Sequence, residues 1–364
     1  MTNNKDKKVL NVPNLRFPEF TNEWGNITIK EACSEFQSGK NIKAEMITGQ
    51  GLYPVYGGNG LRGFTESYNH DGDYILIGRQ GALCGNIRKV TGKTYVTEHA
   101  IAVCASKENE TTFLQYLFQK MKLGQYSDQS AQPGLAVNKL LRLNINVPSK
   151  IEQAKIAKIL SLIDERIITQ NKIIEDLKKL KSAIYQELFS NQQGEEYSLS
   201  ELVEIIKGQQ INGNELSENG KYYVMNGGIM PSGYYDDYNT EAGTISISEG
   251  GNSCGYVQYN SSKFWSGGHC YTLHIKPAAP ISTLFLFHFL KWKETDIMTL
   301  RIGSGLPNIQ KKDLSKVSII VPTLDKQQRI MTLLSTFQMK IEHEDMYAIN
   351  LNKQKQYLLS QMFI

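Results

Sequence analysis

Two segments of this chain carry apolar residues at alternating steps of four and three positions. The first series, seam 1, consists of Ile156, Leu160, Ile163, Ile167, Gln170, Ile174, Leu177, Lys181, Ile184 and Leu188. The second series, seam 2, lies 174 positions later and consists of Ile330, Leu334, Phe337, Ile341, Glu344, Ala348, Leu351, Lys355, Leu358 and Met362. Eight of the ten positions in each series are apolar, and residues 151–189 and 325–363 contain no glycine or proline. This pattern predicts two long helices with coiled-coil seams.

A seam on one helix is also typical of a helix packed on an ordinary core, but two equivalent seams in one chain favour their pairing with each other. Pro148 and Pro322 precede the two segments, at positions where a helix can begin. Each helix follows a globular region, so antiparallel pairing would put the two regions at opposite ends and give the chain an internal pseudo-twofold axis. Gln170 and Glu344 would then lie near mid-helix, where polar residues can fix the register.

The remaining sequence is also duplicated. Glycine-rich runs with alternating apolar residues predict short strands and tight turns, followed by one compact helix. The run YILIGRQGALCG from Tyr74 matches TISISEGGNSCG from Thr244 at an offset of 170. We therefore expect a mixed α/β fold with two similar globular domains, residues 25–147 (head 1) and 191–321 (head 2). The other expected parts are an N-terminal segment (residues 1–24), a central helix (148–190) and a C-terminal helix (322–364).

Composition narrows the class of protein only in part. Hydrophobic residues make up 40% and charged residues 21% of the chain, which is typical of a globular protein, and no apolar run is long enough to span a membrane. The N-terminus lacks the apolar core of a secretory signal. Five cysteines without a CxxC pair favour reduced thiols and a cytoplasmic location. The net charge of +4 permits nucleic-acid binding but does not indicate it.

Four segments give the chain a resemblance to a known family. They are LRFPEFTNEW (residues 15–24), SAQPGL (130–135), PSKIEQAKIAKILSLID (148–164) and PTLDKQQRIMTLLSTF (322–337). Together with the repeat order, they resemble the specificity (S) subunit of type I restriction–modification systems over essentially the whole chain. One departure is that Glu152-Gln153 is replaced by Lys326-Gln327 in the second copy, so only the glutamines match.

The resemblance implies a DNA-recognition subunit without catalytic residues or a cofactor of its own. Each head would recognise one half of an asymmetric bipartite site in double-stranded DNA, and the paired helices would set the spacer. Two methylation (M) subunits carrying S-adenosylmethionine would bind the conserved regions and methylate adenine at N6. Restriction (R) subunits, which use ATP and Mg²⁺, would complete the complex.

The candidate DNA contacts are polar, aromatic and basic side chains on the glycine-rich turns. In head 1 they are Lys40, Asn41, Lys43, Tyr56, Asn59, Arg62, Arg79, Gln80 and Lys93. In head 2 they are Lys207, Gln209, Gln210, Asn226, Tyr234, Ser248, Asn252, Lys263 and Trp265. Arginine, asparagine and glutamine can pair with base edges, which makes Arg79 and Gln80 the best candidates for base recognition. Glu249 and Gly250 replace them in head 2, as different half-sites would require.

Other patterns have alternative interpretations. Gly58, Gly60 and Gly63 have the spacing of a dinucleotide-binding loop, but a turn-rich stretch follows where that motif needs a helix. The matched His99 and His269 lack further ligands for a metal, so no metal site is expected. The matched lysines Lys120, Lys122, Lys291 and Lys293 fit either a helix C-terminus or phosphate contacts. A stand-alone enzyme or ligand-binding protein, and a coiled-coil scaffold for proteins, are the competing hypotheses for the function.

Overall fold

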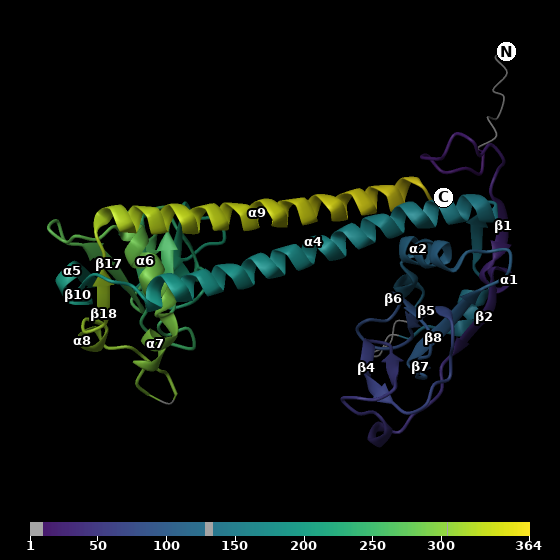
Figure 1. Cartoon of the computed structure of the whole chain (residues 1–364), viewed down its shortest axis with the longest axis horizontal. Helices are drawn as coiled ribbons and strands as arrows, with labels where there is room; N and C mark the ends of the chain where they lie inside the picture. Colours follow the sequence, from purple (N-terminus) through teal and green to yellow (C-terminus); the bar gives the residue numbers. More distant parts are fainter. Residues whose placement is uncertain (1–9, 128–133, 304) are drawn as a thin grey trace, which may run out of the picture. The chain divides into compact units, whose positions relative to one another are not determined.

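The structure is a computed structural model that describes residues 10–127, 134–303 and 305–364. The chain forms two compact units, Met1–Lys172 with Met346–Ile364 (unit 1) and Ile173–Asp345 (unit 2). Unit 1 contains head 1, and unit 2 contains head 2 (Figure 1). The first four residues of the SAQPGL segment lie outside the described residues.

Head 1 is built on a four-stranded antiparallel sheet with the strand order β2-β8-β5-β6. A smaller sheet, β4-β3-β7, and the antiparallel pair β1-β9 complete the head. Its elements are β1 (Gly25–Thr28), α1 (Ile29–Ala32), β2 (Cys33–Ser38), β3 (Tyr53–Gly57), β4 (Gly60–Thr65), β5 (Asp73–Gly78), β6 (Ile87–Thr91), β7 (Tyr95–Val96), β8 (Ala100–Ala105), α2 (Thr111–Met121), α3 (Val137–Leu141) and β9 (Asn144–Val147).

Head 2 repeats this arrangement with the sheets β11-β17-β14-β15 and β13-β12-β16 and the pair β10-β18. Its elements are β10 (Glu195–Ser198), α5 (Leu199–Leu202), β11 (Val203–Lys207), β12 (Tyr222–Met225), β13 (Gly233–Tyr235), β14 (Thr244–Ser248), β15 (Val257–Asn260), β16 (Trp265–Ser266), β17 (Cys270–Ile275), α6 (Thr283–Trp292), α7 (Glu294–Thr299), α8 (Lys311–Leu314) and β18 (Ser318–Val321). The predicted duplication of a mixed α/β domain is therefore confirmed.

The duplication extends to the local signals that start the elements. In head 1, Thr28 and Glu31 form a capping box, because the Thr28 backbone N–H donates to the Glu31 carboxylate at 2.7 Å and Glu31 N–H donates to the Thr28 hydroxyl. In head 2, the backbone N–H of Ser198 donates to the Glu201 carboxylate at 2.6 Å. The same short helix therefore begins at equivalent places in both heads.

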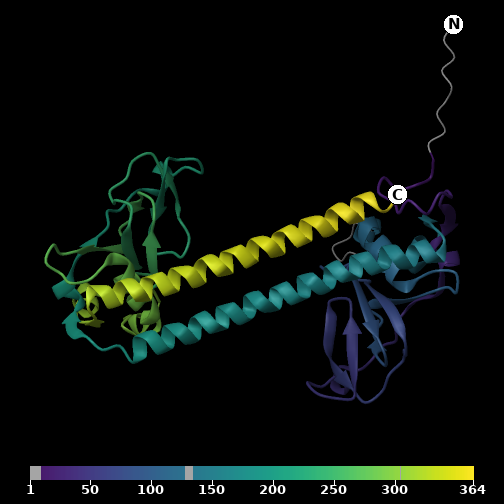
Figure 2. The same cartoon turned by 45° about the horizontal axis from the view of Figure 1, so that its top comes forward.

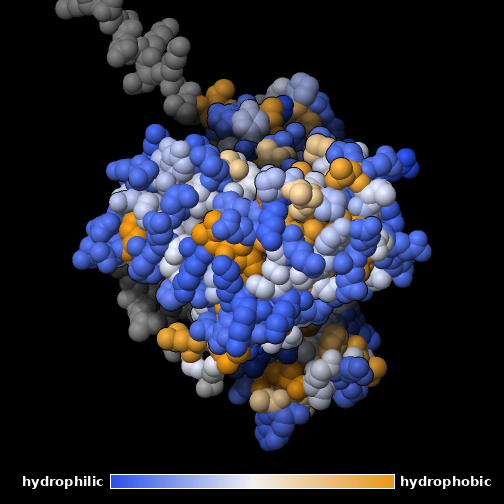
Figure 3. Space-filling model, turned by 90° about the vertical axis from the view of Figure 1, so that its left-hand side faces the viewer, coloured by the Kyte–Doolittle hydropathy of each residue, from blue (hydrophilic) through white to orange (hydrophobic). Residues whose placement is uncertain are grey.

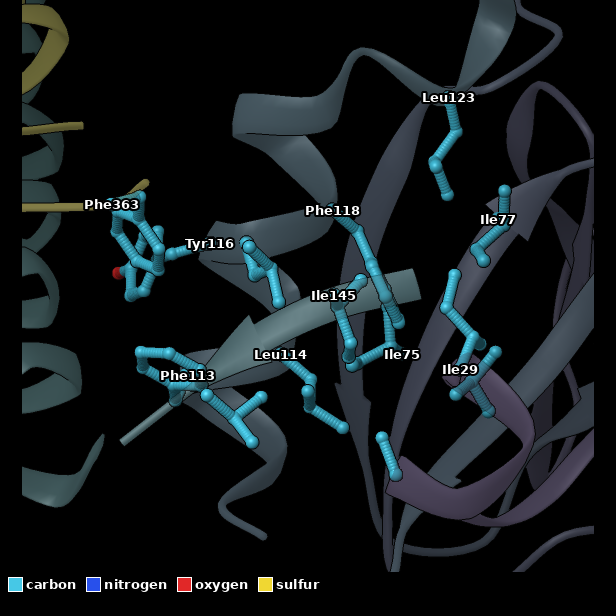
Figure 4. Close-up of a cluster of buried hydrophobic side chains, with 14 of the residues drawn as sticks. Ile29, Ile75, Ile77, Phe113, Leu114, Tyr116, Phe118, Leu123, Ile145 and Phe363 are labelled. Atoms are coloured by element: carbon cyan, nitrogen blue, oxygen red, sulfur yellow. The ribbon is translucent and has the colours of Figure 1, made fainter. Parts of the chain in front are cut away.

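The core of head 1 lies between the main sheet and α2. The inner strand β5 buries Ile75 and Ile77 completely, and α2 buries Phe113 and Phe118. Figure 4 shows these side chains together with Phe363, which comes from the C-terminal end of the chain. The last residues of the chain thus contribute to the core of head 1.

The two seams lie on α4 (Lys150–Ser190) and α9 (Leu324–Gln361), which run side by side in both ribbon views (Figures 1 and 2). Every position of seam 1 and seam 2 is buried or half-buried, whereas most other positions of the two helices are exposed. The predicted pair of long helices with facing seams is confirmed.

In unit 1, the start of α4 packs against the end of α9. Lys355 forms an ion pair with Asp164 at 2.6 Å, and Leu359 and Met362 join the cluster that contains Ile156. Phe363 stacks on Phe113 of α2 with the ring centres 5.2 Å apart. The end of one helix therefore meets the start of the other, as antiparallel pairing requires.

In unit 2, the end of α4 packs against the start of α9 and against head 2. Lys181 donates to the Gln338 side chain at 2.6 Å, and Phe189 lies 5.8 Å from Phe285 and 5.7 Å from Phe289 of α6, measured between ring centres. Phe189 is the counterpart of Phe363 at the offset of 174. The C-terminal end of α9 therefore completes the core of head 1, and the C-terminal end of α4 completes the core of head 2.

The stability of unit 2 should depend on pH through His288 of α6. The Tyr185 hydroxyl of α4 hydrogen-bonds to its Nδ1 atom, and burial, with a smaller effect of Lys181, lowers the pKa of His288 to about 4. The unfolded chain binds this proton below about pH 6.5, so the stabilisation is complete above that pH and is lost as the pH falls toward 4. We expect a loss of about 1–2 kcal/mol between pH 7 and pH 5 in urea unfolding followed by tryptophan fluorescence.

The variant H288Q keeps an acceptor for Tyr185 but does not titrate in this range. It should show a smaller difference in unfolding free energy between pH 7 and pH 5 than the wild type. The same difference in both proteins would contradict the role of His288.

Within the described ranges, no helix is long and apolar enough to cross a membrane. The five cysteines are all unbridged, and burial raises the pKa of Cys33 to about 12 and that of Cys270 to about 11. These thiols are therefore protonated at neutral pH.

Candidate nucleic-acid interface

In head 1, the structure brings two of the predicted turns together. A Cβ atom added at Gly58, in the β3–β4 turn with Asn59, would lie 3.1 Å from the carbonyl oxygen of Gln80 and 2.8 Å from that of His99. Gln80 follows Arg79 directly after β5, and its side-chain oxygen lies 3.0 Å from Nδ1 of His99. The two turns therefore form one polar surface in which a side chain at position 58 would not fit.

The other candidates of head 1 are spread more widely. Lys40, Asn41, Lys43 and Arg62 are exposed, and the backbone carbonyl of Asn41 accepts from Tyr95 at 3.0 Å. Tyr56 is half-buried on β3. Lys93 is exposed and lies over the ring of Tyr68 at 4.7 Å. It follows β6 where Thr91 pairs with Asp73, at the other end of β5 from Arg79. Their role as DNA contacts stays a prediction.

In head 2, three of the predicted residues surround one cavity of about 540 Å³. Lys207, Asn226 and Asn252 line it together with Glu249 and His269. Asn226 fixes the loop before β17, because its side-chain oxygen accepts from the backbone N–H of His269 at 3.0 Å. The cavity thus collects polar groups from four separate segments of the head.

Glu249 is a buried residue of this cavity that the sequence-based list of DNA contacts omitted. It is only 8% exposed, and its Oε1 atom accepts from Lys207 at 2.7 Å and from the Tyr271 hydroxyl at 3.1 Å. Burial raises the pKa of Tyr271 to about 12, and the charge of Glu249 acts in the same direction. The only sequence signal for this position is its alignment with Arg79.

The remaining candidates of head 2 lie beside the cavity or outside it. Trp265 donates to the backbone carbonyl of Gln209 at 3.0 Å, and Lys263 donates to the Tyr238 hydroxyl at 2.7 Å. Tyr234 and Gln210 are exposed. Ser248 is buried, like the other four positions of β14, and its hydroxyl donates to the carbonyl of Gly227 at 2.6 Å.

The two alternative ligand motifs take other forms in the structure. Gly58 and Asn59 connect β3 and β4 in a hairpin, so the glycine spacing does not precede a helix as a dinucleotide-binding loop requires. His99 pairs with Glu98 at 3.1 Å. In the part of the chain that the structure describes, no group of three or more histidine, cysteine, aspartate or glutamate residues could hold a metal ion.

The lysines that end α2 and α6 have different surroundings in the two heads. Lys120 and Lys122 line a cavity of about 800 Å³ together with Lys355 of α9. In head 2, Lys291 pairs with Glu294 at 2.6 Å and Lys293 pairs with Asp296 at 3.3 Å. Lys291 and Lys293 are therefore already paired with carboxylates of this chain.

The matched glutamines at the helix starts have a clear structural role. Gln153 accepts from the backbone N–H of Glu110 at 2.9 Å and donates to the carbonyl of Pro148 at 3.0 Å. Gln327 accepts from the backbone N–H of Ser282 at 2.9 Å and donates to the carbonyl of Pro322 at 2.9 Å. Both residues are 1% exposed, so they fix the start of α4 to the start of α2 and the start of α9 to the start of α6.

The surface in the view of Figure 3 is mainly hydrophilic, and its hydrophobic side chains form small separate groups. Such a surface fits a polar partner better than a large apolar one.

Comparison with known proteins identifies a family pattern in both halves of the chain. The family model described as "Type I restriction modification DNA specificity domain" matches residues 21–179 and 191–351. The type I restriction enzyme EcoprrI specificity subunit of Escherichia coli is 40% identical over 173 residues, which cover 46% of this chain and 42% of the relative. A putative type I specificity subunit of Mycoplasma pneumoniae is 34% identical over 162 residues, 44% of this chain and 43% of the relative. The aligned parts thus span less than half of these two relatives.

The crystal structure of a type I restriction–modification S subunit from M. genitalium is similar in fold. It aligns with 97% of this chain and 99% of its own, with a TM-score of 0.67 and 22% sequence identity. The arrangement of two heads with two long packed helices is therefore shared with that protein.

Proposed function

Because this chain belongs to the family of type I restriction–modification DNA specificity domains, we propose that it is the DNA-recognition subunit of a type I restriction–modification enzyme. In this role it is not catalytic. Each head recognises one half of an asymmetric bipartite site in double-stranded DNA, and the α4/α9 pair sets the spacer. The chain acts in the cytoplasm, where it meets the DNA.

The partners follow from the same proposal. Two M subunits bind the conserved helical regions and transfer methyl groups from S-adenosylmethionine to adenine N6. R subunits, which use ATP and Mg²⁺, join the complex for DNA cleavage. This chain then contributes binding and positioning alone.

The observation that carries the proposal is the repetition of one head fold with different side chains at equivalent turns. Arg79 and Gln80 of head 1 correspond to Glu249 and Gly250 of head 2 at the offset of 170. Equal folds with unequal polar groups suit a target whose two halves have similar shapes and different base sequences.

The test is to shorten both long helices by one heptad. Removing residues 168–174 and 345–351 keeps the seam period and shortens the pair by roughly 10 Å. We expect the complex with M subunits to methylate a library of random DNA at the same two half-sites, with a spacer shorter by about three base pairs. Sequencing of the methylated molecules gives both quantities.

Exchange of residues 25–147 for the corresponding head of a relative is the matched control. It should change one half-site and keep the spacer. If shortening the helices changed the half-sites themselves, the division between recognition and spacing would be wrong. If the wild-type complex methylated no defined site, the proposed function would be wrong.

A further inference from the structure

The residue that follows β5 in head 1 and the residue that follows β14 in head 2 have side chains of opposite charge. Arg79 follows β5 and Glu249 follows β14. Their backbone N–H groups donate to the carbonyls of His99 and His269, each at 2.9 Å. The backbone carbonyl of Arg79 accepts from Leu135 at 2.9 Å, and that of Glu249 accepts from Ile309 at 2.8 Å. The two residues therefore occupy the same place in the fold, independently of the sequence alignment.

The carboxylate of Glu249 is only half satisfied. Lys207 and Tyr271 both donate to Oε1, whereas none of the described residues donates a hydrogen bond to the buried Oε2. The Nδ1 atom of His269 lies 3.9 Å from Oε2, beyond hydrogen-bond length. An ion pair with Lys207 accounts for the position of Oε1, but it gives Oε2 no hydrogen-bond donor.

The surroundings of Oε2 belong to the candidate interface. Glu249 and His269 line the cavity of about 540 Å³ that also contains Asn226 and Asn252. The side chain of His269 is 62% exposed and lies 3.9 Å from the buried Oε2. A donor group that enters the cavity would reach Oε2 after a turn of this ring.

The chemistry of the DNA major groove identifies that donor. Guanine presents two acceptors, N7 and O6, and suits an arginine, which only donates. A carboxylate only accepts, and cytosine presents the N4 amino group as a donor. Adenine also presents an amino group, but its N7 acceptor lies beside it and repels a carboxylate.

We propose that Glu249 selects a cytosine in the half-site of head 2 through its N4 amino group, and that Arg79 selects a guanine at the equivalent position of the other half-site. The inference rests on the proposed function and assigns it two specificity-determining residues. Both heads then recognise a G·C pair at this position, one through its guanine and the other through its cytosine.

The test uses the complete complex of this chain with its M subunits and a DNA library with random half-sites. The wild type should methylate sites with cytosine at one position of the second half-site. Glutamine pairs with adenine through N6 and N7, so E249Q should change that preference from cytosine to adenine, by roughly 5- to 140-fold. The other half-site and the spacer should stay the same.

Two further variants separate base recognition from stability. Y271F removes a donor to Oε1 and leaves the accepting carboxylate, so it should lower the rate of methylation without changing the base. R79Q should change the preferred base from guanine to adenine in the first half-site only. In each variant the other head is unchanged, so the half-site of that head serves as an internal reference.

The outcomes are distinct. A wild-type complex that methylates no defined sequence contradicts the proposed function. A defined sequence whose second half-site requires no cytosine, or E249Q with an unchanged sequence, contradicts the role of Glu249 and leaves the proposed function intact. An altered base in Y271F contradicts it as well, because the accepting group is unchanged there.

Discussion

Replacing Phe363 with alanine should lower the unfolding free energy of unit 1 by about 3–5 kcal/mol, because it removes a buried aromatic ring from a packed core. Phe363 is 3% exposed, and its ring centre lies 5.2 Å from that of Phe113 and 6.4 Å from that of Trp24. Urea unfolding followed by the fluorescence of Trp24 reports the change when Trp265 and Trp292, both in unit 2, are replaced with phenylalanine. An unchanged midpoint would show that the end of α9 does not stabilise head 1.

The neighbouring residue provides the control. Ile364 is 45% exposed, so I364A should change the unfolding free energy by less than about 0.5 kcal/mol. The matched variant F189A should destabilise unit 2, because Phe189 is 2% exposed among α6 residues. Similar losses from F363A and F189A would confirm that both helix ends have the same role.

Replacing Arg16 with alanine should lower the unfolding free energy of unit 1 about as much as F363A does. Its guanidinium forms two hydrogen bonds to Glu152, at 2.7 and 2.8 Å, and Glu152 is 1% exposed and also lies 3.4 Å from Nε1 of Trp24. The hydrogen bond to Glu152 raises the pKa of Arg16, so the guanidinium stays charged. The variant R16A leaves a buried carboxylate without its cation, and we expect a loss of about 3–5 kcal/mol in urea unfolding.

The double variant R16A/E152A distinguishes a buried unpaired charge from a loss of packing. It should be more stable than R16A, because no unpaired carboxylate remains. The surface pair of Lys155 and Glu19 is the control, since both side chains are about half exposed and K155A should cost less than about 1 kcal/mol. If R16A and K155A had equal effects, the buried pair would not stabilise the helix start.

The sequence was sufficient for features that repeat along the chain. The seams of α4 and α9 could be predicted because a period of three and four residues is visible in the sequence, and each apolar position is buried or half-buried as expected. The duplicated head could be predicted because glycines and apolar runs recur at nearly constant offsets. Local regularity of this kind depends on few distant contacts.

Features that depend on distant contacts escaped prediction. Arg16 and Glu152 are 136 positions apart, and nothing in either segment alone indicates their pairing. Ser248 is a polar residue in a glycine-rich stretch, but β14 is one of the two inner strands of its sheet and buries it. Glu249 is buried because β11, β14 and β17 converge on it, which a single strand does not reveal.

The contribution of the C-terminal ends of α9 and α4 to the cores of head 1 and head 2 constrains how such a protein can acquire new heads. A replacement for residues 25–147 must keep an aromatic surface for Phe363, since that ring comes from a part of the chain that the exchange leaves in place. The same holds for head 2 and Phe189. Recombination between relatives can therefore vary the turns predicted to contact DNA only while α2 and α6 keep their packing partners. New sequences at the turns then depend on conserved packing at the helices.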